Sequence, residues 1–448
     1  MPAARGAEMI FDKDCGRRRH LSTVGATSAA VAMSENGEQP FLRSEECIDF
    51  LRSYGRVMLI TRGLPGSGKA GIAETVKRTY PDSKVISADQ MFLGIGAVDK
   101  TIETTTEAHL LCQKRTEEAL QGNTSVVMNR NNNATVRETA RYIELAAKYG
   151  YLVIVIDTLQ KEDMTVEYLA ACNTKLLGTT YISRALDKWE DVYPLCTGWF
   201  LKPSDKLYLL RRLALLQKSC MDNGLRTSEV YALPGPSFCL ARFCWFGMDE
   251  SNKAYFNKVK NLIGTIHLLR VYGYAIINEI IYGLVELDEI LQDELASGDA
   301  VEFLGTALWK PTSCIVPPDK VLPQTDEAES SNFMPSTHAP MASKHPRFVV
   351  LGNTNGISTT PNAPTPKIAE VWENALQKTE GLPSVRIGNA TIQDHNDVRL
   401  ILLQDVPCFE TVFAGFYQPY VPRYRSCKYF KTKAGCKRGT TCMFDHCR

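Results

Sequence analysis

Apolar runs alternate with amphipathic stretches over the first half of the chain. Four runs have the length and β-branched content of strands, and the segments between them place apolar residues at helical spacing. Strands that alternate with helices of this length predict a parallel sheet covered by helices on both faces. The expected strands are 56–61, 84–87, 125–128 and 151–157, and the expected helices are 44–51, 103–121, 134–148 and 204–221, the last closing the unit.

The pattern changes near residue 227, where strands and helices become less regular and an α+β domain is expected. Its expected elements are 238–246, 252–261, 272–281 and 348–351, with a loop rich in Pro, Ser and Thr at 317–345. Residues 1–40 are rich in Gly, Ala and Ser and are predicted to be a disordered arm. The sequence therefore predicts an arm at 1–40, domains at 41–222 and 223–422, and a short unit at 423–448.

Amino-acid composition and charge exclude several classes of protein. With 44% hydrophobic and 23% charged residues, the chain can bury cores, and its net charge of +1 excludes a uniformly basic nucleic-acid binder. From 423 to 448 there are eight basic residues and one acid, a charge of +7, which leaves −6 for the rest. The most apolar segment, 266–287, carries too many charges for a membrane helix. Fourteen cysteines without a secretion signal indicate reduced thiols or metal ligands, in the cytoplasm or the nucleus.

A glycine-rich turn between the first strand and a helix predicts a phosphate-binding loop. Its backbone amides can converge on phosphate oxygens, and its lysine adds a positive charge, so ATP or GTP is the candidate ligand. The next residue is Ala70, where this loop type carries the hydroxyl that coordinates Mg²⁺. We therefore expect the loop to bind phosphate rather than to catalyse phosphoryl transfer. The loop residues concerned are Gly63, Gly66, Ser67, Gly68 and Lys69.

Several segments together resemble the myelin-type 2′,3′-cyclic-nucleotide 3′-phosphodiesterases. They are RVMLITRGLPGSGKAG at 56–71, VISAD at 85–89, GWF at 198–200, FC at 243–244 and ETVFAGFYQPY at 410–420. The resemblance implies a polynucleotide-kinase-like P-loop domain at 41–222 and a two-histidine phosphoesterase domain at 223–422. Members of this family open a 2′,3′-cyclic phosphate with two His-x-Thr motifs on facing strands.

This chain departs from the family at each catalytic position. One histidine must act as a base and the other as an acid, while two hydroxyl groups bind the phosphate oxygens. Aligned with the motifs, the first histidine and threonine are replaced by Phe238 and Leu240, and the second pair by Phe348 and Val350. None of these side chains transfers a proton, so no catalytic residue is assigned.

The expected kinase-like domain, 41–222, also lacks an acidic residue that related enzymes use. After the third strand the chain reads Asn129-Arg130-Asn131-Asn132-Asn133, where P-loop enzymes usually carry an acid for the metal. Asp89 matches the catalytic base of related kinases, although an aspartate after a strand is also a common helix cap. The leading interpretation is a catalytically degenerate scaffold. The alternatives are an active phosphodiesterase or RNA-end-processing enzyme, and a switch that binds nucleotide without hydrolysis.

The last 22 residues have the ligand spacing of a CCCH zinc finger. Three thiolates and one imidazole form a closed tetrahedral site for a structural Zn²⁺, without which so short a unit does not fold. The expected ligands are Cys427, Cys436, Cys442 and His446.

The finger resembles those of proteins that bind single-stranded RNA. Phe444 and Arg438 are candidates for stacking on bases, and Lys437 for a contact with phosphate. A finger that contacts protein remains the alternative. The family often ends in a prenylated cysteine, whereas this chain ends His446-Cys447-Arg448, so no lipid anchor is expected.

Overall fold

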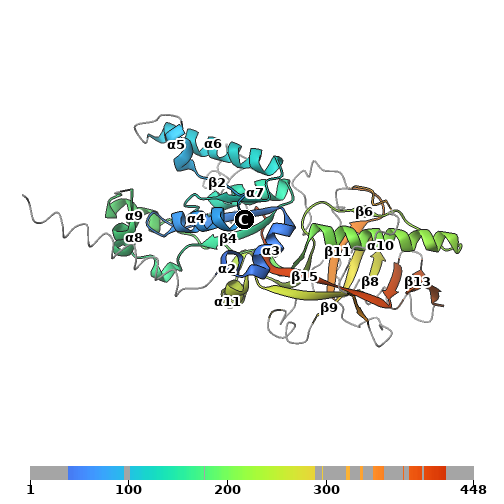
Figure 1. The fold of residues 1–448 in the computed structure, drawn as a ribbon. Helices are drawn as coiled ribbons and strands as arrows, with labels where there is room; N and C mark the ends of the chain where they lie inside the picture. Colours follow the sequence, from blue (N-terminus) through green and yellow to red (C-terminus); the bar gives the residue numbers. More distant parts are fainter. Residues whose placement is uncertain are drawn as a thin grey trace, which may run out of the picture.

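The computed structural model describes residues 39–94, 101–175, 177–287, 295, 319–322, 333–335, 347–357, 377, 383–395 and 398–419. Two domains lie side by side, one built on a parallel sheet and one on antiparallel strands (Figure 1). A single hydrophobic cluster runs through both, because Phe50 and Leu59 of the first domain belong to the same cluster as Trp199 and Phe413 of the second. The two domains therefore share a core.

The first domain has a four-stranded parallel sheet in the order β2-β3-β1-β4. The expected strands and helices of this half are confirmed, with shifts of one to three residues at their ends. The strands are β1 (Val57–Arg62), β2 (Lys84–Ile86), β3 (Val126–Asn129) and β4 (Leu152–Asp157). The helices are α2 (Pro40–Arg43), α3 (Glu45–Tyr54), α4 (Lys69–Thr79), α5 (Ala88–Gly94), α6 (Ile102–Gln121), α7 (Val136–Lys148), α8 (Val166–Cys172) and α9 (Thr179–Leu186), with a 3₁₀ turn η1 (Lys161–Asp163).

Local sequence explains these elements. Strand β1 is buried at all six positions, as expected for a central strand with helices on both faces. Helix α7 begins at a reciprocal capping box, in which the Thr135 hydroxyl accepts from the Glu138 amide and the Glu138 carboxylate accepts from the Thr135 amide. Its apolar residues then bury one face against the sheet.

The second domain is an eleven-stranded antiparallel sheet that closes on itself. Strand β8 pairs with both β9 and β15, so the order β15-β5-β7-β11-β9-β8 forms a ring, and β14, β13 and β12 extend from β8. The strands are β5 (Cys196–Leu201), β6 (Tyr231–Ala232), β7 (Phe238–Phe243), β8 (Ile266–Ile277), β9 (Ile280–Glu286), β10 (Phe333–Pro335), β11 (Arg347–Asn353), β12 (Val385–Ile387), β13 (Ala390–His395), β14 (Val398–Leu403) and β15 (Asp405–Phe416). The helical elements are α10 (Pro203–Asp222), α11 (Glu250–Val259) and the 3₁₀ turns η2 (Trp245–Gly247) and η3 (Lys260–Leu262).

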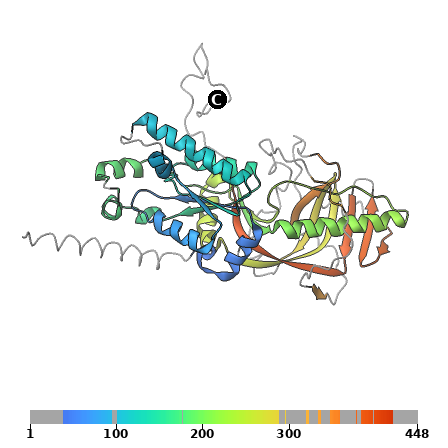
Figure 2. The same ribbon diagram turned by 45° about the horizontal axis from the view of Figure 1, so that its top comes forward.

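Two expectations differ from this architecture. The second domain was expected to be α+β, whereas its described part is a barrel-like closed sheet with few helices. The boundary after residue 222 is also wrong, because β5 pairs with β7 and β15 of the second domain. Helix α10 likewise packs against β6, β11 and β12, and lies along the β domain in Figures 1 and 2. The division of the chain therefore lies before Cys196.

The apolar segment 266–287 is a hairpin of β8 and β9. Its two-residue turn, Asn278-Glu279, has positive φ values of 49° and 67°, the backbone that tight antiparallel hairpins require. In the part of the chain that the structure describes, no helix is both long and apolar enough to cross a membrane. The arm at 1–38 and most of 317–345 lie outside the described residues, although β10, inside that expected loop, pairs with β15.

Candidate phosphate site and the apolar face of β7 and β11

The glycine-rich turn follows β1 directly and leads into α4, as the sequence predicts. Gly66 has a φ of 91°, and a Cβ there would lie 2.2 Å from the carbonyl oxygen of Leu169 in α8, so only glycine fits. Lys69 begins α4, and its Nζ donates to the carbonyl oxygens of Gly63 at 2.7 Å and Leu64 at 2.8 Å. In the free protein the lysine therefore binds the carbonyls of its own loop.

Positive charge surrounds this lysine. Burial, together with the nearby cations Lys175 and Arg130, lowers the pKa of Lys69 to about 7, against the opposing effect of Asp89. Arg130 follows β3, and its guanidinium donates to the Ser87 hydroxyl at 3.3 Å after β2. Lys175 comes from the segment between α8 and α9 and forms an ion pair with Asp89. Three cations and one carboxylate thus meet at the loop, an arrangement suited to an anion.

Asp89 lies in the first turn of α5, and the residue that caps this helix is Ser87, two positions earlier. The Ser87 hydroxyl accepts from the Gln90 amide at 3.4 Å, so Asp89 does not act as the helix cap. Its carboxylate instead faces the phosphate loop through Lys175. The structure therefore brings Asp89 to the same site as Lys69.

The asparagines after β3 hold the loops of the site together. The Asn133 amide donates to the Thr61 carbonyl oxygen at 2.7 Å and to the Asn129 side chain at 2.9 Å. Asn131 accepts from the Ala88 amide and donates to the Tyr142 hydroxyl, both at 2.8 Å. These side-chain amides form hydrogen bonds that join β1, β3 and α5. They carry no negative charge, so they do not replace the metal-binding acid that is usual at this place.

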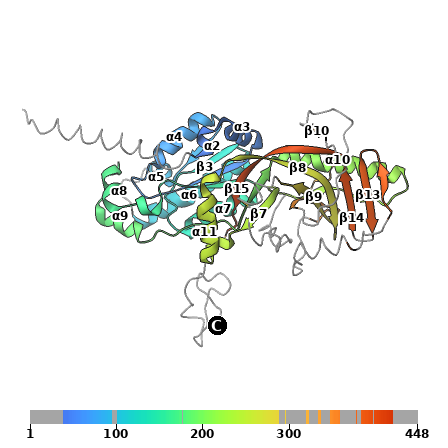
Figure 3. The same cartoon turned by 90° about the horizontal axis from the view of Figure 1, so that it is seen from below.

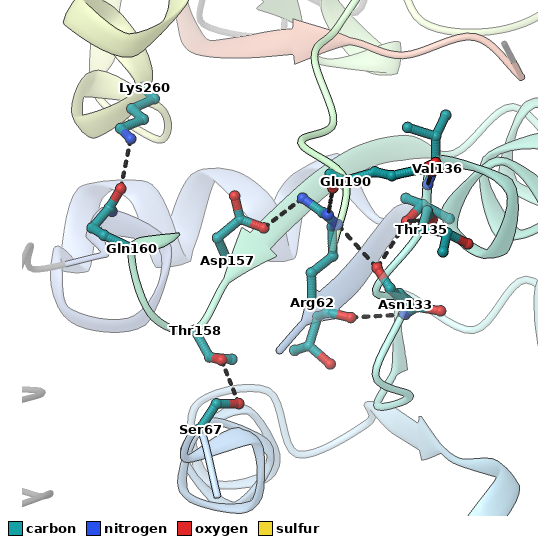
Figure 4. A network of polar contacts seen from close by, with 12 residues as sticks. Arg62, Ser67, Asn133, Thr135, Val136, Asp157, Thr158, Gln160, Glu190 and Lys260 are labelled. Carbon is teal, nitrogen blue, oxygen red and sulfur yellow. Dashed lines mark hydrogen bonds and ion pairs between the residues drawn. The ribbon is translucent and has the colours of Figure 1, made fainter. Parts of the chain in front are cut away.

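A buried arginine fixes the end of β1 just before the turn (Figure 4). The Arg62 side chain is fully buried, donates to Asp157 Oδ1 at 2.9 Å and to the carbonyl oxygens of Asn133 and Glu190, and lies 4.4 Å from the Trp189 ring centroid. With Arg62 paired to it, Asp157 at the end of β4 is a structural partner.

The turn is also tied to β4 and to the second domain. The Thr158 hydroxyl donates to the Ser67 Oγ at 2.7 Å (Figure 4). Two residues later, Gln160 accepts from Lys260 of η3 at 2.6 Å, at the junction where α11 lies in Figure 3. The phosphate loop is thus connected to the barrel through the end of β4.

The structure brings together the four positions that the sequence aligned with the His-x-Thr motifs. Strands β7 and β11 are antiparallel neighbours, and Val349 lies opposite Cys239. Residues at odd distances from this pair point to the opposite face of the sheet. Phe238, Leu240, Phe348 and Val350 therefore share one face of two adjacent strands, as two facing motifs would.

Apolar packing fills that face. The Phe238 ring stacks on Phe200 with centroids 4.7 Å apart and approaches Phe416 at 4.9 Å. The Phe348 ring meets Tyr282 edge-on at 5.8 Å. Phe238, Leu240 and Phe348 are buried and Val350 is partly buried. The face has the composition of a hydrophobic core.

The expected zinc and RNA residues, 427–446, lie outside the described residues. Within the described part, no group of three or more His, Cys, Asp or Glu side chains could hold a metal ion. The sequence missed Lys175, which has no motif and reaches Asp89 across 86 residues. Arg130 was also missed as a site residue, because the sequence indicated only that this segment lacks an acid. A basic residue that follows a strand beside a phosphate loop is a signal that could have identified it.

Comparisons with known proteins found matches to the first domain. Residues 58–176 match the AAA domain family. Human NEDD4-binding protein 2 is 33% identical over 136 residues, which cover 30% of this chain and 8% of that protein. Mouse 2′,3′-cyclic-nucleotide 3′-phosphodiesterase is 27% identical over 168 residues, 36% of this chain and 38% of that protein.

A solved structure of a fungal RNA kinase is 10% identical and covers 81% of this chain and 99% of its own, with a TM-score of 0.23. A TM-score this low does not establish a shared fold. Two conclusions remain. Residues 58–176 match the AAA domain family, and a stretch of 168 residues is distantly similar, at 27% identity, to mouse 2′,3′-cyclic-nucleotide 3′-phosphodiesterase.

Proposed function

We propose that this protein is a catalytically degenerate relative of the cyclic-nucleotide phosphodiesterases that binds RNA without processing its ends. The observation that carries the proposal is the apolar face of β7 and β11, with Phe238, Leu240, Phe348 and Val350 at the four positions. Opening a cyclic phosphate requires a base, an acid and donors to the phosphate oxygens. Phenylalanine, leucine and valine supply none of these.

The phosphate loop supports a binding role without phosphoryl transfer. Its glycines and Lys69 lie between β1 and α4, the place of a phosphate-binding loop, while Ala70 offers no hydroxyl to Mg²⁺. Arg130 stands among the residues where an acid would bind the metal, and Lys175 adds a second cation near Lys69. These fixed charges can neutralise a phosphate in place of a metal ion. ATP or GTP is the candidate ligand.

The tail supplies the RNA contact in this proposal. Cys427, Cys436, Cys442 and His446 hold a structural Zn²⁺, and the charge of +7 between 423 and 448 attracts a polyanion. Phe444, Arg438 and Lys437 contact single-stranded RNA by stacking and by charge. The names of the relatives include an enzyme of nucleotide 2′,3′-cyclic phosphates, which is consistent with RNA ends as the ancestral ligand. Protein partners are the alternative for the same finger.

Turnover of 2′,3′-cyclic NADP tests the loss of activity. The purified full chain should leave this substrate intact, because no proton-transfer group lies on the β7–β11 face. The matched variant carries Phe238→His, Leu240→Thr, Phe348→His and Val350→Thr together, which restores the groups that the reaction needs. Robust turnover by the natural sequence would support the rival interpretation, an active phosphodiesterase whose catalytic residues lie elsewhere.

A further inference from the structure

A cavity of about 700 Å³ lies between the two domains, away from the phosphate loop. The first domain contributes the amino-terminal edge of its sheet, including Arg56 before β1 and Tyr149 before β4. The second domain contributes the first turn of α10, the segment 232–237 and the end of β15. The phosphate loop is at the opposite, carboxyl-terminal edge of the same sheet, so the two sites are separate.

A buried lysine lies in the wall of this cavity. Lys206 is only 8% exposed, and its ammonium donates to the carbonyl oxygens of Leu233 and, at 3.3 Å, Gly235. Among the described residues, no carboxylate forms an ion pair with it, and burial alone lowers its pKa to about 8. A buried charge without a counter-ion is costly, and an anion in the cavity would remove that cost.

Two further features favour an anion at this place. Lys206 lies in the first turn of the 20-residue helix α10, whose amino-terminal end carries partial positive charge. Arg56 is an exposed residue in the part of the wall that the first domain contributes, and its guanidinium donates to the neutral Asn123 side chain at 3.1 Å. Against the basic lining residues Arg56, Lys148 and Lys206 there is one acid in the described lining, Asp319, which is itself exposed.

The remaining wall suits a flat, partly apolar group. Phe416 and Tyr149 are partly exposed there, together with the rings of Pro234 and Pro236. Phe416 packs on Phe238, so this wall continues from the apolar face of β7 and β11. Aromatic and proline rings offer surfaces on which a base can stack. The volume lies within the range of ordinary small-molecule sites.

We propose that this cavity binds a nucleoside monophosphate, with its phosphate at Lys206 and Arg56 and its base against Phe416 and Tyr149. The site does not depend on the phosphate loop or on the zinc finger. It would give the protein a mononucleotide-binding site between its two domains, and an occupant would contact both of them.

Calorimetric titration of the full chain with AMP, GMP, CMP and UMP tests this proposal. All variants carry Lys69→Met, so that binding at the phosphate loop does not contribute. At least one nucleotide should bind, and Lys206→Met should weaken it at least tenfold. The matched control is Lys202→Met, the same change four residues earlier in the chain, where the ammonium pairs with Glu410 and does not line the cavity.

Arg56→Gln provides a second variant whose folding is not at risk, because Arg56 is exposed, and it should also weaken binding at least tenfold. If Lys206→Met does not fold, Arg56→Gln decides. The proposal is overturned if none of the four nucleotides binds, or if binding is unchanged in Lys206→Met or, where that variant is unfolded, in Arg56→Gln. Lys206 would then serve only to hold the segment 233–235.

Discussion

At the scale of single residues, Lys69 links phosphate binding to pH. Its pKa is lowered to about 7, so the free protein loses the ammonium as the pH rises through neutrality. A bound phosphate requires the charged form. ATP affinity should therefore fall between pH 7.5 and 9, by up to about tenfold per pH unit, or about 1.4 kcal/mol. Lys69→Met should bind weakly at every pH in this range.

The same titration, repeated with and without Mg²⁺, tests the role assigned to Arg130 and Lys175. Because Ala70 cannot coordinate a metal and fixed cations already surround the loop, Mg²⁺ should change ATP affinity by less than tenfold. A larger gain with Mg²⁺, or an affinity that stays constant from pH 7.5 to 9, would contradict this account of the site.

At the scale of elements, the apolar face of β7 and β11 should be destabilised by a polar substitution. Phe238→His alone places an imidazole between the rings of Phe200 and Phe416, without a partner for its nitrogens. We expect a loss of about 3 kcal/mol in the free energy of unfolding, measured in urea. The control is Tyr181→His, which changes a ring that is 52% exposed and should stay within about 0.5 kcal/mol. Equal stability of the two variants would mean that position 238 still accommodates a polar group.

The local pattern of apolar residues was sufficient to predict the strands and helices of the first domain. Its strands are buried on both faces and read as continuous apolar runs, and the turn after β1 has a backbone requirement that only glycine meets. Alignment with the His-x-Thr motifs also identified four residues that share a face. That result needed only the two-residue period of strands and the correct register of β7 against β11.

Closure of the second domain was not predictable in this way. The ring depends on pairing between β8 and β15, where Ile266 lies opposite Val412, almost 150 positions later. Neither strand signals its partner in its own sequence. Likewise, the cations at the phosphate loop come from segments that are distant in the chain, and Lys206 looks like an ordinary surface lysine on an amphipathic helix.

At the scale of the whole molecule, we propose from the charge of residues 423–448 that this tail carries most of the RNA affinity. We expect one Zn²⁺ per chain, and loss of both zinc and RNA binding in Cys436→Ser, because the finger needs its metal to fold. Phe444→Ala should keep zinc and bind single-stranded RNA about tenfold more weakly. Lys437→Ala should reduce the salt dependence of binding. Zinc analysis and filter binding measure these effects. A chain ending at residue 420 that holds RNA as tightly as the full chain would place the RNA site in the two domains.

We propose that this protein binds RNA and leaves its ends unchanged. The most direct measurement uses one single-stranded RNA oligonucleotide with a 5′-hydroxyl and a 2′,3′-cyclic phosphate, incubated with the full chain, ATP and Mg²⁺. The mouse phosphodiesterase serves as the positive control for the cyclic end. RNA recovered from the complex is then weighed by mass spectrometry. We predict that the RNA is retained by the protein with both ends intact. Conversion of the cyclic end to a 2′-phosphate, or of the 5′-hydroxyl to a phosphate, would contradict the claim.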